Sequence, residues 1–367
     1  MSVRLPFRNL EPTFAGGLID DPILLVRVRP TGRNLMFDCG QIHHLAKRII
    51  TRLAALFISH AHMDHWMGVD SVIRHLHASS EVVDLFGPPG IADKFAKKLS
   101  SYDWNLAEAH WGSFRVHEIL PRQIRRHLFS GPDGFQRRPL DSDPRETQQP
   151  IYQDQSCQVL AETCEHRVDS LIFRVNESPD FLIDKEKLAR LGLLPGPWLG
   201  ELKRRFLLCR VASPLRHVMQ RDVGGNPREI EFEDAGILWE KIAQPSRQGS
   251  IGYISDVGYS EANRDKIVNF MQGVDLLVCE CTFLDEARAR ARESAHLCTG
   301  DVNQLLEVLR PAFVLPVHLS KTYCRRSEDL YRELIPPAGT QLLQLPLRRT
   351  QRPLLAAEMG WQQQGET

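Results

Sequence analysis

Residues 57–68 read FISHAHMDHWMG and carry a dense group of side chains that bind metal ions. Within six positions stand four such residues, His60, His62, Asp64 and His65. Imidazole nitrogens and carboxylate oxygens are ligands of zinc, iron and manganese. Four ligands from so short a segment cannot all surround one ion, so the spacing favours two adjacent metals. A pair about 3.5 to 4 Å apart can hold a hydroxide and clamp the attacking and leaving oxygens of a displacement.

An apolar run over residues 53–58 precedes this loop and predicts a buried strand. Continued strand alternation would place His60 and His62 on one side at its carboxyl end. Asp64 and His65 then fall in the turn that opens the next helix. The alternative is a histidine-rich loop that binds nothing or collects stray metal. We favour the metal site, because the order His-x-His-x-Asp-His after a buried strand is a specific pattern.

Length and composition indicate a soluble globular protein. The chain has 367 residues, of which 42% are hydrophobic, enough for one large domain or two small ones. No apolar run approaches the roughly 20 residues of a membrane span, and the amino terminus lacks the apolar core of a signal peptide. The eight cysteines form no Cys-x-x-Cys pair, which favours reduced thiols. We therefore expect a cytoplasmic protein with no membrane partner.

The formal net charge is zero, so the overall electrostatics do not argue for a nucleic-acid partner. Such an argument depends on local basic clusters, each of which alone is typical of solvated surface. The clusters are residues 122–126 with Arg137 and Arg138, then Lys203, Arg204 and Arg205, then residues 321–326, and finally Arg348, Arg349 and Arg352.

Strand and helix patterns alternate along the chain, which favours an α/β architecture. We expect strands over residues 23–28, 34–37, 53–58, 82–86, 158–163, 170–175, 251–255, 275–279 and 313–317. We expect helices over residues 43–50, 66–76, 91–99, 261–271 and 301–309. Residues 121–156 are polar and predict a surface insertion. The Gly/Pro-rich residues 192–200 predict a projecting loop within an arm over residues 185–210, whereas residues 206–248 have no clear pattern.

Several polar residues sit at or just past the carboxyl end of a predicted strand, as active-site residues do on α/β scaffolds. They are Asp38, His60, His62, Asp256, Glu280 and His318. Asp256 is a candidate bridging carboxylate, although by itself it is equally typical of a helix N-cap. His166 is either a ligand or a surface histidine, and His318 is either a ligand or a strand-end residue of the core.

His296 and Glu280 can form an imidazole oriented by a carboxylate, able to donate a proton to a leaving oxygen. The alternative for His296 is a solvated histidine near a helix start. His75 and His77 form a second His-x-His pair, but on a helix they would point apart, so we exclude them. We interpret Cys279 and Cys281, which flank Glu280, as small buried side chains.

Further stretches resemble a known family. They are GPPG at residues 87–90, HRVDSLIFRV at 166–175, the Gly/Pro-rich 187–205, and the segments 275–296 and 317–323. With the His-x-His-x-Asp-His loop, they resemble the metallo-β-lactamase superfamily and, within it, the ribonuclease Z family, endonucleases that trim the 3′ end of precursor tRNA. The resemblance covers residues 37–323 and implies a four-layer αβ/βα sandwich, with two mixed sheets flanked by helices, in a single domain over residues 1–367.

The resemblance also implies a metal centre, a reaction and partners. The implied ligands are His60, His62 and His166 for one metal, Asp64, His65 and His318 for the second, and Asp256 as the bridge. Two divalent ions, zinc first and manganese or iron as alternatives, would hold the hydroxide that attacks the phosphodiester. Asp64 would act in catalysis, and His296, oriented by Glu280, would assist the leaving oxygen. Precursor tRNA would be the RNA partner, and the protein would be a homodimer.

The sequence departs from the family pattern in several places. The opening Gly-Thr-Gly loop is absent, Ser255-Asp256-Val257 replaces Gly-Asp-Thr, and His296-Leu297-Cys298 replaces His-Ser-Thr. Thr322 stands where a phosphate-binding arginine is expected. Beside it, Lys321 can hold phosphate only as a point charge. The candidate substrate-binding residues are Lys203, Arg204, Arg205 and Lys321. The alternatives are a metal-dependent hydrolase of small phosphodiesters or other esters, and an RNA-binding protein without activity.

Overall fold

The computed structural model describes residues 4–146, 148–178, 182–207, 213–244 and 247–362, which form two compact units where sequence analysis expected one domain. Unit 1 comprises Met1–Tyr152, Cys157–Glu177 and Gly249–Thr367, and unit 2 comprises Gln153–Ser156 and Ser178–Gln248. Most of unit 2 is an insertion in the sequence between β12 (Asp169–Glu177) and β15 (Ser250–Ile254). These two strands pair directly with each other, so the insertion leaves the sheet of unit 1 continuous.

The first sheet of unit 1 has, among the described residues, the strand order β19-β1-β2-β3-β4-β5-β6-β7-β8, with β9 beside β7. The bounds are β1 (Leu10–Phe14), β2 (Leu24–Val28), β3 (Arg33–Phe37), β4 (Leu53–Phe57), β5 (Val82–Gly87), β6 (Ser113–Ile119), β7 (Gln123–Ser130), β8 (Arg137–Pro139), β9 (Asp143–Pro144) and β19 (Leu354–Leu355). Strands β3 to β6 run parallel. The residues that follow β3 and β4 therefore emerge at the same edge of the sheet.

The second sheet has, in the described part of the chain, the order β10-β11-β12-β15-β16-β17-β18-β20. The further bounds are β10 (Tyr152–Gln153), β11 (Cys157–Glu165), β16 (Leu276–Glu280), β17 (Phe313–Val317), β18 (Gln341–Gln344) and β20 (Gly360–Gln362). Strands β15 to β18 run parallel. Every residue of β15 and β16 is buried, as expected of parallel strands covered on both faces.

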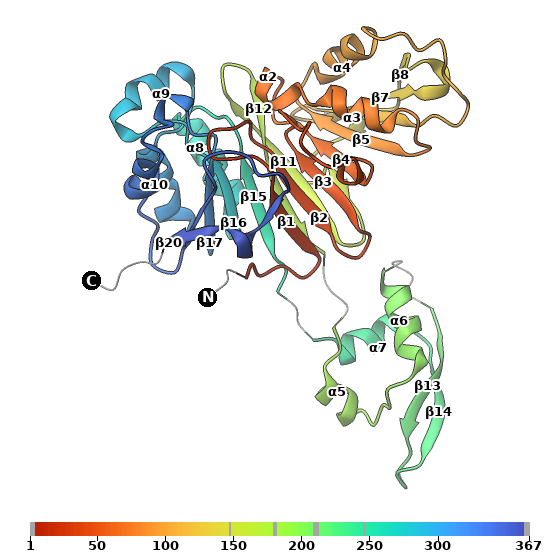
Figure 1. The fold of residues 1–367 in the computed structure, drawn as a ribbon. Coiled ribbons are helices and arrows are strands. Elements are labelled where there is room, and N and C mark those ends of the chain that lie inside the picture. The colour runs from red at the N-terminus through yellow and green to blue at the C-terminus, as the bar shows by residue number, and fades with distance from the viewer. Residues whose placement is uncertain (1–3, 147, 179–181, 208–212, 245–246, 363–367) are drawn as a thin grey trace. The chain divides into compact units, whose positions relative to one another are not determined.

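Helices cover the outer face of each sheet (Figure 1). Helices α3 and α4 share a hydrophobic core with the first sheet, and α8 and α10 share one with the second. The order helix, sheet, sheet, helix confirms the expected four-layer αβ/βα sandwich of two mixed sheets. The helices of unit 1 are α1 (Lys47–Ile50), α2 (Met63–Trp66), α3 (Val69–Leu76), α4 (Ile91–Leu99), α8 (Glu261–Met271), α9 (Arg288–Ser294), α10 (Thr299–Leu309) and α11 (Ser327–Glu333).

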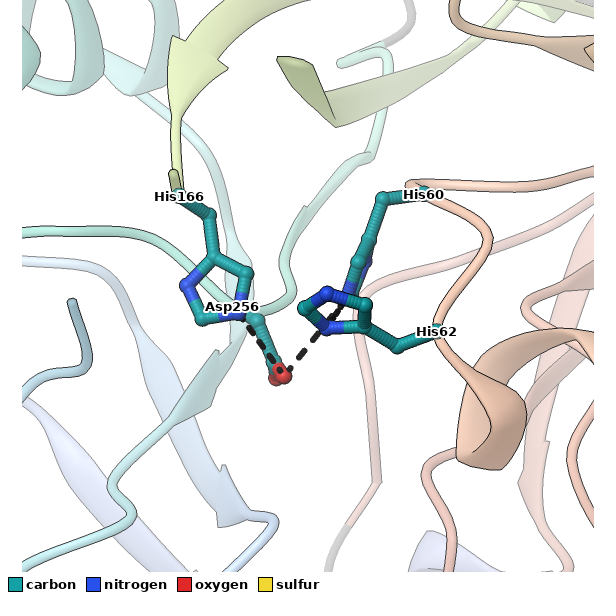
Figure 2. A group of neighbouring side chains, drawn as sticks. All are labelled: His60, His62, His166 and Asp256. Carbon is teal, nitrogen blue, oxygen red and sulfur yellow. Dashed lines mark hydrogen bonds and ion pairs between the residues drawn. The ribbon is translucent and has the colours of Figure 1, made fainter. Parts of the chain in front are cut away.

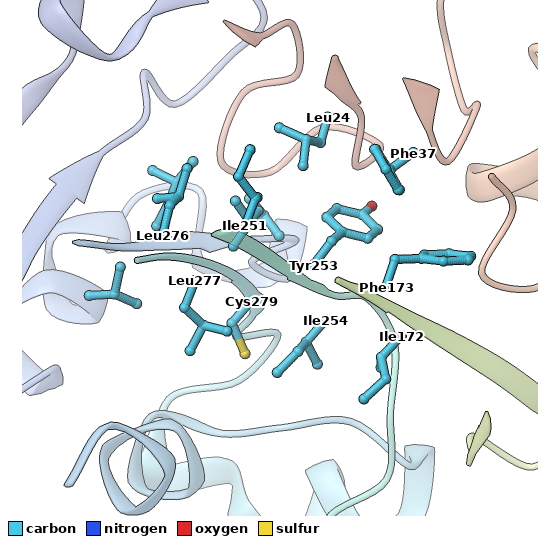
Figure 3. Close-up of a cluster of buried hydrophobic side chains, with 14 of the residues drawn as sticks. Leu24, Phe37, Ile172, Phe173, Ile251, Tyr253, Ile254, Leu276, Leu277 and Cys279 are labelled. Atoms are coloured by element: carbon cyan, nitrogen blue, oxygen red, sulfur yellow. The ribbon is translucent and has the colours of Figure 1, made fainter. Parts of the chain in front are cut away.

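Aromatic side chains fill the space between the two sheets (Figure 3). The rings of Phe37 and Phe57, from neighbouring strands of the first sheet, stack with centroids 4.7 Å apart. Phe173 and Tyr253 reach Phe37 from the second sheet, at 5.6 and 5.9 Å. Cys279, on the opposite face of the second sheet (Figure 3), is also fully buried, as expected of a small apolar side chain. This contact between the sheets brings the strand ends that carry the polar residues close together.

Most predicted elements are present, and α4, α8 and β17 have the expected bounds. The prediction of one helix over residues 66–76 is wrong, because the structure has α2 and α3 with a break at Gly68. There the backbone packs so closely on Gly40 that a Cβ on Gly68 would collide with the Gly40 carbonyl. The helix expected over residues 43–50 is limited to its last turn, α1.

Residues 121–156 do not form a separate insertion. Strand β7 pairs with β6 along most of its length, and β8 and β9 pair with β7, so residues 123–144 extend the first sheet. Strand β10, near the end of the segment, belongs to the second sheet. Ile124 and Phe129 are buried in the two different hydrophobic cores of unit 1, whereas Arg125 and Arg138 are exposed. The polar composition that suggested a loop belongs to strands at the end of the sheet, where much of the surface meets solvent.

Unit 2 has its own small hydrophobic core. It contains α5 (Lys185–Arg190), α6 (Pro197–Leu207), β13 (Leu215–Arg221), β14 (Pro227–Phe232) and α7 (Ala235–Ile242). Part of the loop expected over residues 192–200 is helical, because Pro197 begins α6, where its missing N–H costs nothing. Trp198 and Leu202 on α6 are buried in this core. Residues 208–210 of the expected arm lie outside the described residues. None of the helices in the described part of the chain combines the length and apolar composition of a membrane span.

Candidate metal centre

The loop after β4 brings together the first four predicted ligands. Because β4 ends at Phe57, strand alternation does not extend to His60 and His62. The loop nevertheless turns them toward each other, with His60 Nε2 2.8 Å from His62 Nδ1. Asp64 and His65 occupy the first turn of α2, as the sequence predicted. These four donors therefore come from a loop and the start of a helix.

Three remote side chains reach this loop from the second sheet. His166 lies in the turn between β11 and β12, and Asp256 follows β15. His318 follows β17 directly, with a φ of 62°. A hydrogen bond from Leu171 N to Ser59 O, 2.9 Å long, ties β12 to the loop. Strand ends from both sheets thus converge on one place.

The seven predicted ligands form two groups that share Asp256. The donor atoms of each group lie within 4.8 Å of one another. The first group is His60, His62, His166 and Asp256 (Figure 2), and the second is Asp64, His65, Asp256 and His318. Asp256 Oδ2 lies 3.2 Å from His65 Nε2 and 3.7 Å from His166 Nε2. Asp256 therefore stands between the two groups.

The donor set fits divalent cations. Among the described residues, the buried atoms His65 Nε2 and Asp256 Oδ1 make no hydrogen bond. Asp256 Oδ1 lies 3.0 Å from His318 Nδ1, an ion-pair distance without hydrogen-bond alignment. A buried polar atom without a partner is costly, and coordination of a cation would satisfy both atoms. Nitrogen and carboxylate donors suit zinc, manganese and iron.

The electrostatics of the cluster favour a positive charge at Asp256. Burial acts to raise the pKa of Asp256, but His318 and His65 outweigh it and hold that pKa well below its usual value. Burial acts to lower the pKa of His65, but Asp256 and Asp38 hold it well above 6.5. Asp256 likewise overcomes burial at His318 and raises its pKa to about 10. Because a metal binds the neutral imidazole, metal binding at these residues would be coupled to the loss of protons.

Asp38 is a functional residue to which sequence analysis assigned no role. It is fully buried just past β3, and His65 Nδ1 donates a hydrogen bond to its Oδ2 at 2.9 Å. The same oxygen accepts from Tyr253 Oη at 2.9 Å and from the Oγ atoms of Ser59 at 2.9 Å and Ser255 at 2.8 Å. Asp38 thereby fixes the His65 tautomer and leaves Nε2 for a metal. The feature of the sequence that pointed to Asp38 was its position just past a predicted strand.

Glu280 and His296 form a second buried pair beside the metal ligands. His296 Nδ1 lies 3.2 Å from Glu280 Oε2, and burial, which acts to lower the pKa of His296, is outweighed by Glu280. The Glu280 carboxylate also accepts from Val257 N and Thr282 Oγ1, both at 2.7 Å. These two residues, with Asp256 and His318, could hold a metal too. We interpret them as a proton-transfer pair, because hydrogen bonds already occupy the carboxylate.

The four basic residues predicted to bind substrate differ in their surroundings. Three of them lie on α6 in unit 2. Lys203 is exposed, but Arg204 and Arg205 each form an ion pair with Glu201 at 2.7 Å. Lys321 is exposed in a short helix after β17. The free positive charge on α6 is therefore smaller than the sequence suggested.

Comparisons with known proteins identify relatives along most of the chain. No family model matches the sequence. Ribonuclease Z of Deinococcus radiodurans is 26% identical over 306 residues, which cover 82% of this chain and 86% of that protein. Ribonuclease Z of Methanosarcina acetivorans is 23% identical over 361 residues, which cover 94% of this chain and 95% of that protein.

Solved structures share the fold. The long form of ribonuclease Z from yeast aligns with 97% of this chain and 43% of its own, at a TM-score of 0.53 and 11% identity. The metallo-β-lactamase fold protein YhfI from Bacillus subtilis aligns with 88% of this chain and 91% of its own, at a TM-score of 0.49 and 12% identity. The chain thus has the metallo-β-lactamase fold, resembles ribonuclease Z along most of its length, and is a metal-dependent hydrolase.

Proposed function

We propose that the protein is an endoribonuclease of the ribonuclease Z type that cleaves the 3′ trailer from precursor tRNA with two metal ions. The observation that carries this proposal is the pair of donor groups sharing Asp256, with the Glu280–His296 pair beside them. The curated relatives named ribonuclease Z support the substrate. All seven ligand positions carry metal-binding side chains, which argues against an inactive RNA-binding protein.

In this proposal each donor group holds one ion. The ligands are His60, His62 and His166 for the first ion, Asp64, His65 and His318 for the second, and Asp256 for both. Zinc is our first choice, and manganese or iron suits the same donors. When bound, such ions supply a hydroxide nucleophile and neutralise charge on the phosphate. The protein contributes the spacing of the ligands and the polar groups that orient them.

His296 is the proposed general acid. Glu280 accepts the hydrogen bond from Nδ1–H, so the other ring nitrogen, Nε2, can carry a proton to the leaving oxygen. The pKa of His296 is raised, because Glu280 outweighs the burial that acts to lower it. The side chain of Asp64 is 42% exposed. It is therefore the carboxylate that we expect to orient the attacking water.

The test is cleavage of a precursor tRNA that carries a 3′ trailer. We expect one cut at the boundary between tRNA and trailer, mapped by sequencing the products. His296→Ala should keep its metal and slow turnover by about 10²- to 10⁴-fold, the usual contribution of a general acid. Metal content measured in parallel separates loss of the acid from loss of the centre. An intact trailer with the wild-type protein would contradict the proposal.

A second candidate is a hydrolase of small phosphodiesters or other esters. It is favoured by the ion pairs of Arg204 and Arg205 with Glu201, which leave less charge on unit 2 for RNA. Glu177 N donates to Gly249 O at 2.9 Å, so a short turn can replace residues 178–248. If unit 2 binds tRNA, this deletion should abolish tRNA cleavage and spare hydrolysis of a small chromogenic phosphodiester. Equal losses on both substrates would assign unit 2 a structural role.

Assembly and location complete the proposal. We propose a homodimer that acts on precursor tRNA in the cytoplasm, and the support is the resemblance to ribonuclease Z. Light scattering on the purified protein tests the dimer, and a monomer at micromolar concentration would contradict it. Fractionation of cells that express a tagged protein tests the location.

A further inference from the structure

Helix α9 carries arginines at every second position, and their surroundings differ. Arg288 pairs with Asp285 at 2.5 Å, and Arg292 pairs with Asp301 at 2.6 Å. Arg290, between them, is exposed. Within the described residues, no carboxylate lies at ion-pair distance from its guanidinium. Of these three arginines, Arg290 alone keeps its charge available to a ligand.

The guanidinium of Arg290 is held against an aromatic ring next to the proposed general acid. Its Cζ lies 5.5 Å from the centroid of the Phe283 ring, and the rings of Phe283 and His296 are 6.1 Å apart. Phe283 is nearly buried, so its ring offers a fixed surface. Helix α9 ends at Ser294, two residues before His296. Phe283 therefore contacts both the guanidinium of Arg290 and the ring of His296.

The charge of Arg290 also acts on the segment that follows His318. Burial raises the pKa of Tyr323, and the positive charges of Arg290 and Arg326 act to lower it. Arg326 is already paired with Glu286 at 2.9 Å. Arg290 thus contributes an uncompensated positive charge to the rim on the His296 side of the centre.

We propose that Arg290 binds a backbone phosphate of the RNA, the one adjacent to the cleaved phosphate on the leaving-oxygen side. The inference rests on the proposed function and adds a specific phosphate subsite to it. A guanidinium presents a planar fork that matches phosphate oxygens, and stacking on Phe283 restricts the side chain before the ligand arrives. The position of His296 identifies the leaving-oxygen side of the cleaved phosphate, because the group that protonates the leaving oxygen must face that oxygen.

Binding measurements test the charge without requiring turnover. In an Asp64→Ala background, fluorescence anisotropy with a single-stranded RNA across a salt series measures affinity and its salt dependence. Adding Arg290→Ala should weaken binding about tenfold, the usual size of one charge-assisted contact. It should also reduce the slope of log affinity against log salt by about 0.7, the value for one phosphate on a single strand. Arg288→Ala, whose charge is already paired, is the control and should leave the slope unchanged.

Substrates with one neutral linkage test the position. A methylphosphonate placed next to the cleaved linkage, on the leaving-oxygen side, should lower kcat/KM of the full-length wild-type protein about tenfold. It should lower kcat/KM of Arg290→Ala much less, because the contact is already absent. A methylphosphonate several nucleotides away should affect both proteins equally. Arg290→Lys should retain the salt slope and recover part of the affinity, because it keeps the charge and loses the fork.

The outcomes separate the two proposals. If wild type cleaves and binds RNA and Arg290→Ala matches it in affinity and salt slope, the subsite is wrong and the proposed function stands. Equal effects of the adjacent methylphosphonate on wild type and Arg290→Ala would also overturn the subsite. If wild type neither cleaves nor binds RNA, the proposed function fails and the subsite fails with it. Thermal melting of Arg290→Ala verifies that the variant is folded.

Discussion

Replacing Asp38 by asparagine should weaken both the fold and the metal centre. The exchange keeps the shape of the side chain and removes its charge. Four donors converge on Oδ2, and a fifth, Ser59 N, donates to Oδ1 at 2.7 Å. An amide has only one oxygen, so its NH₂ group must face either the fixed Ser59 N–H or the four donors at the other side. At least one buried donor then loses its acceptor.

The magnitude follows from these contacts. An unpaired buried donor costs about 1 to 3 kcal/mol, and the charged bond from His65 contributes about 1.5 to 3 kcal/mol. We therefore expect Asp38→Asn to lower the free energy of unfolding of the metal-free protein by about 3 to 5 kcal/mol, the usual cost of breaking a buried ion pair. Without Asp38 to orient His65, metal affinity should fall about 10- to 100-fold.

Urea denaturation of the metal-free protein measures the first effect, and zinc titration against a competing chelator measures the second. Tyr253→Phe is the matched control, because it removes one hydroxyl donor from the same oxygen and keeps the charge. It should cost about 1 kcal/mol of stability and leave zinc affinity unchanged. Wild-type stability and zinc affinity in Asp38→Asn would refute the role of Asp38. Equal effects in both variants would refute the role of its charge.

Three further predictions concern single residues. His62→Ala should reduce the metal bound per chain, measured by atomic emission, and full occupancy would remove His62 from the ligand set. Burial acts to raise the pKa of Asp84, but His117 and Arg115 outweigh burial, and the pKa of Asp84 is lowered. The ionised Asp84 therefore stabilises the fold at neutral pH, and this stabilisation is lost as the pH falls through the pKa of Asp84 in the folded protein. Asp84→Asn should therefore cost about 1 to 2 kcal/mol at neutral pH, because solvent partly screens the pair with Arg115. The difference should vanish in acid; a constant difference in urea melts would contradict this. Gly90 has a φ of 83°, so Gly90→Ala should cost about 1 to 2 kcal/mol in the same assay, and an unchanged midpoint would contradict the strain.

The sequence determined the metal loop and most of the strands, because both depend on local patterns. The ligand types in residues 60–65 and the apolar run before them are adjacent in the chain. The mainly apolar runs that became β15 and β16 predict strands in the same way. Sequence patterns were least informative where a strand carries many polar residues, as in β7, or where tertiary packing breaks a helix, as at Gly68. In both cases the deciding contact is with a residue distant in the sequence.

Only the tertiary structure determined how the remote residues meet. Asp38 and Tyr253 are 215 positions apart, yet a 2.9 Å hydrogen bond joins them because the two sheets pack face to face. The same packing places Asp256 between the two donor groups. Tertiary packing also distinguishes arginines that the sequence presents alike, since Arg292 on α9 pairs with Asp301 on α10 whereas Arg290 does not. Chain position identifies which side chains can bind a metal or a phosphate, and the folded arrangement decides which of them remain free to do so.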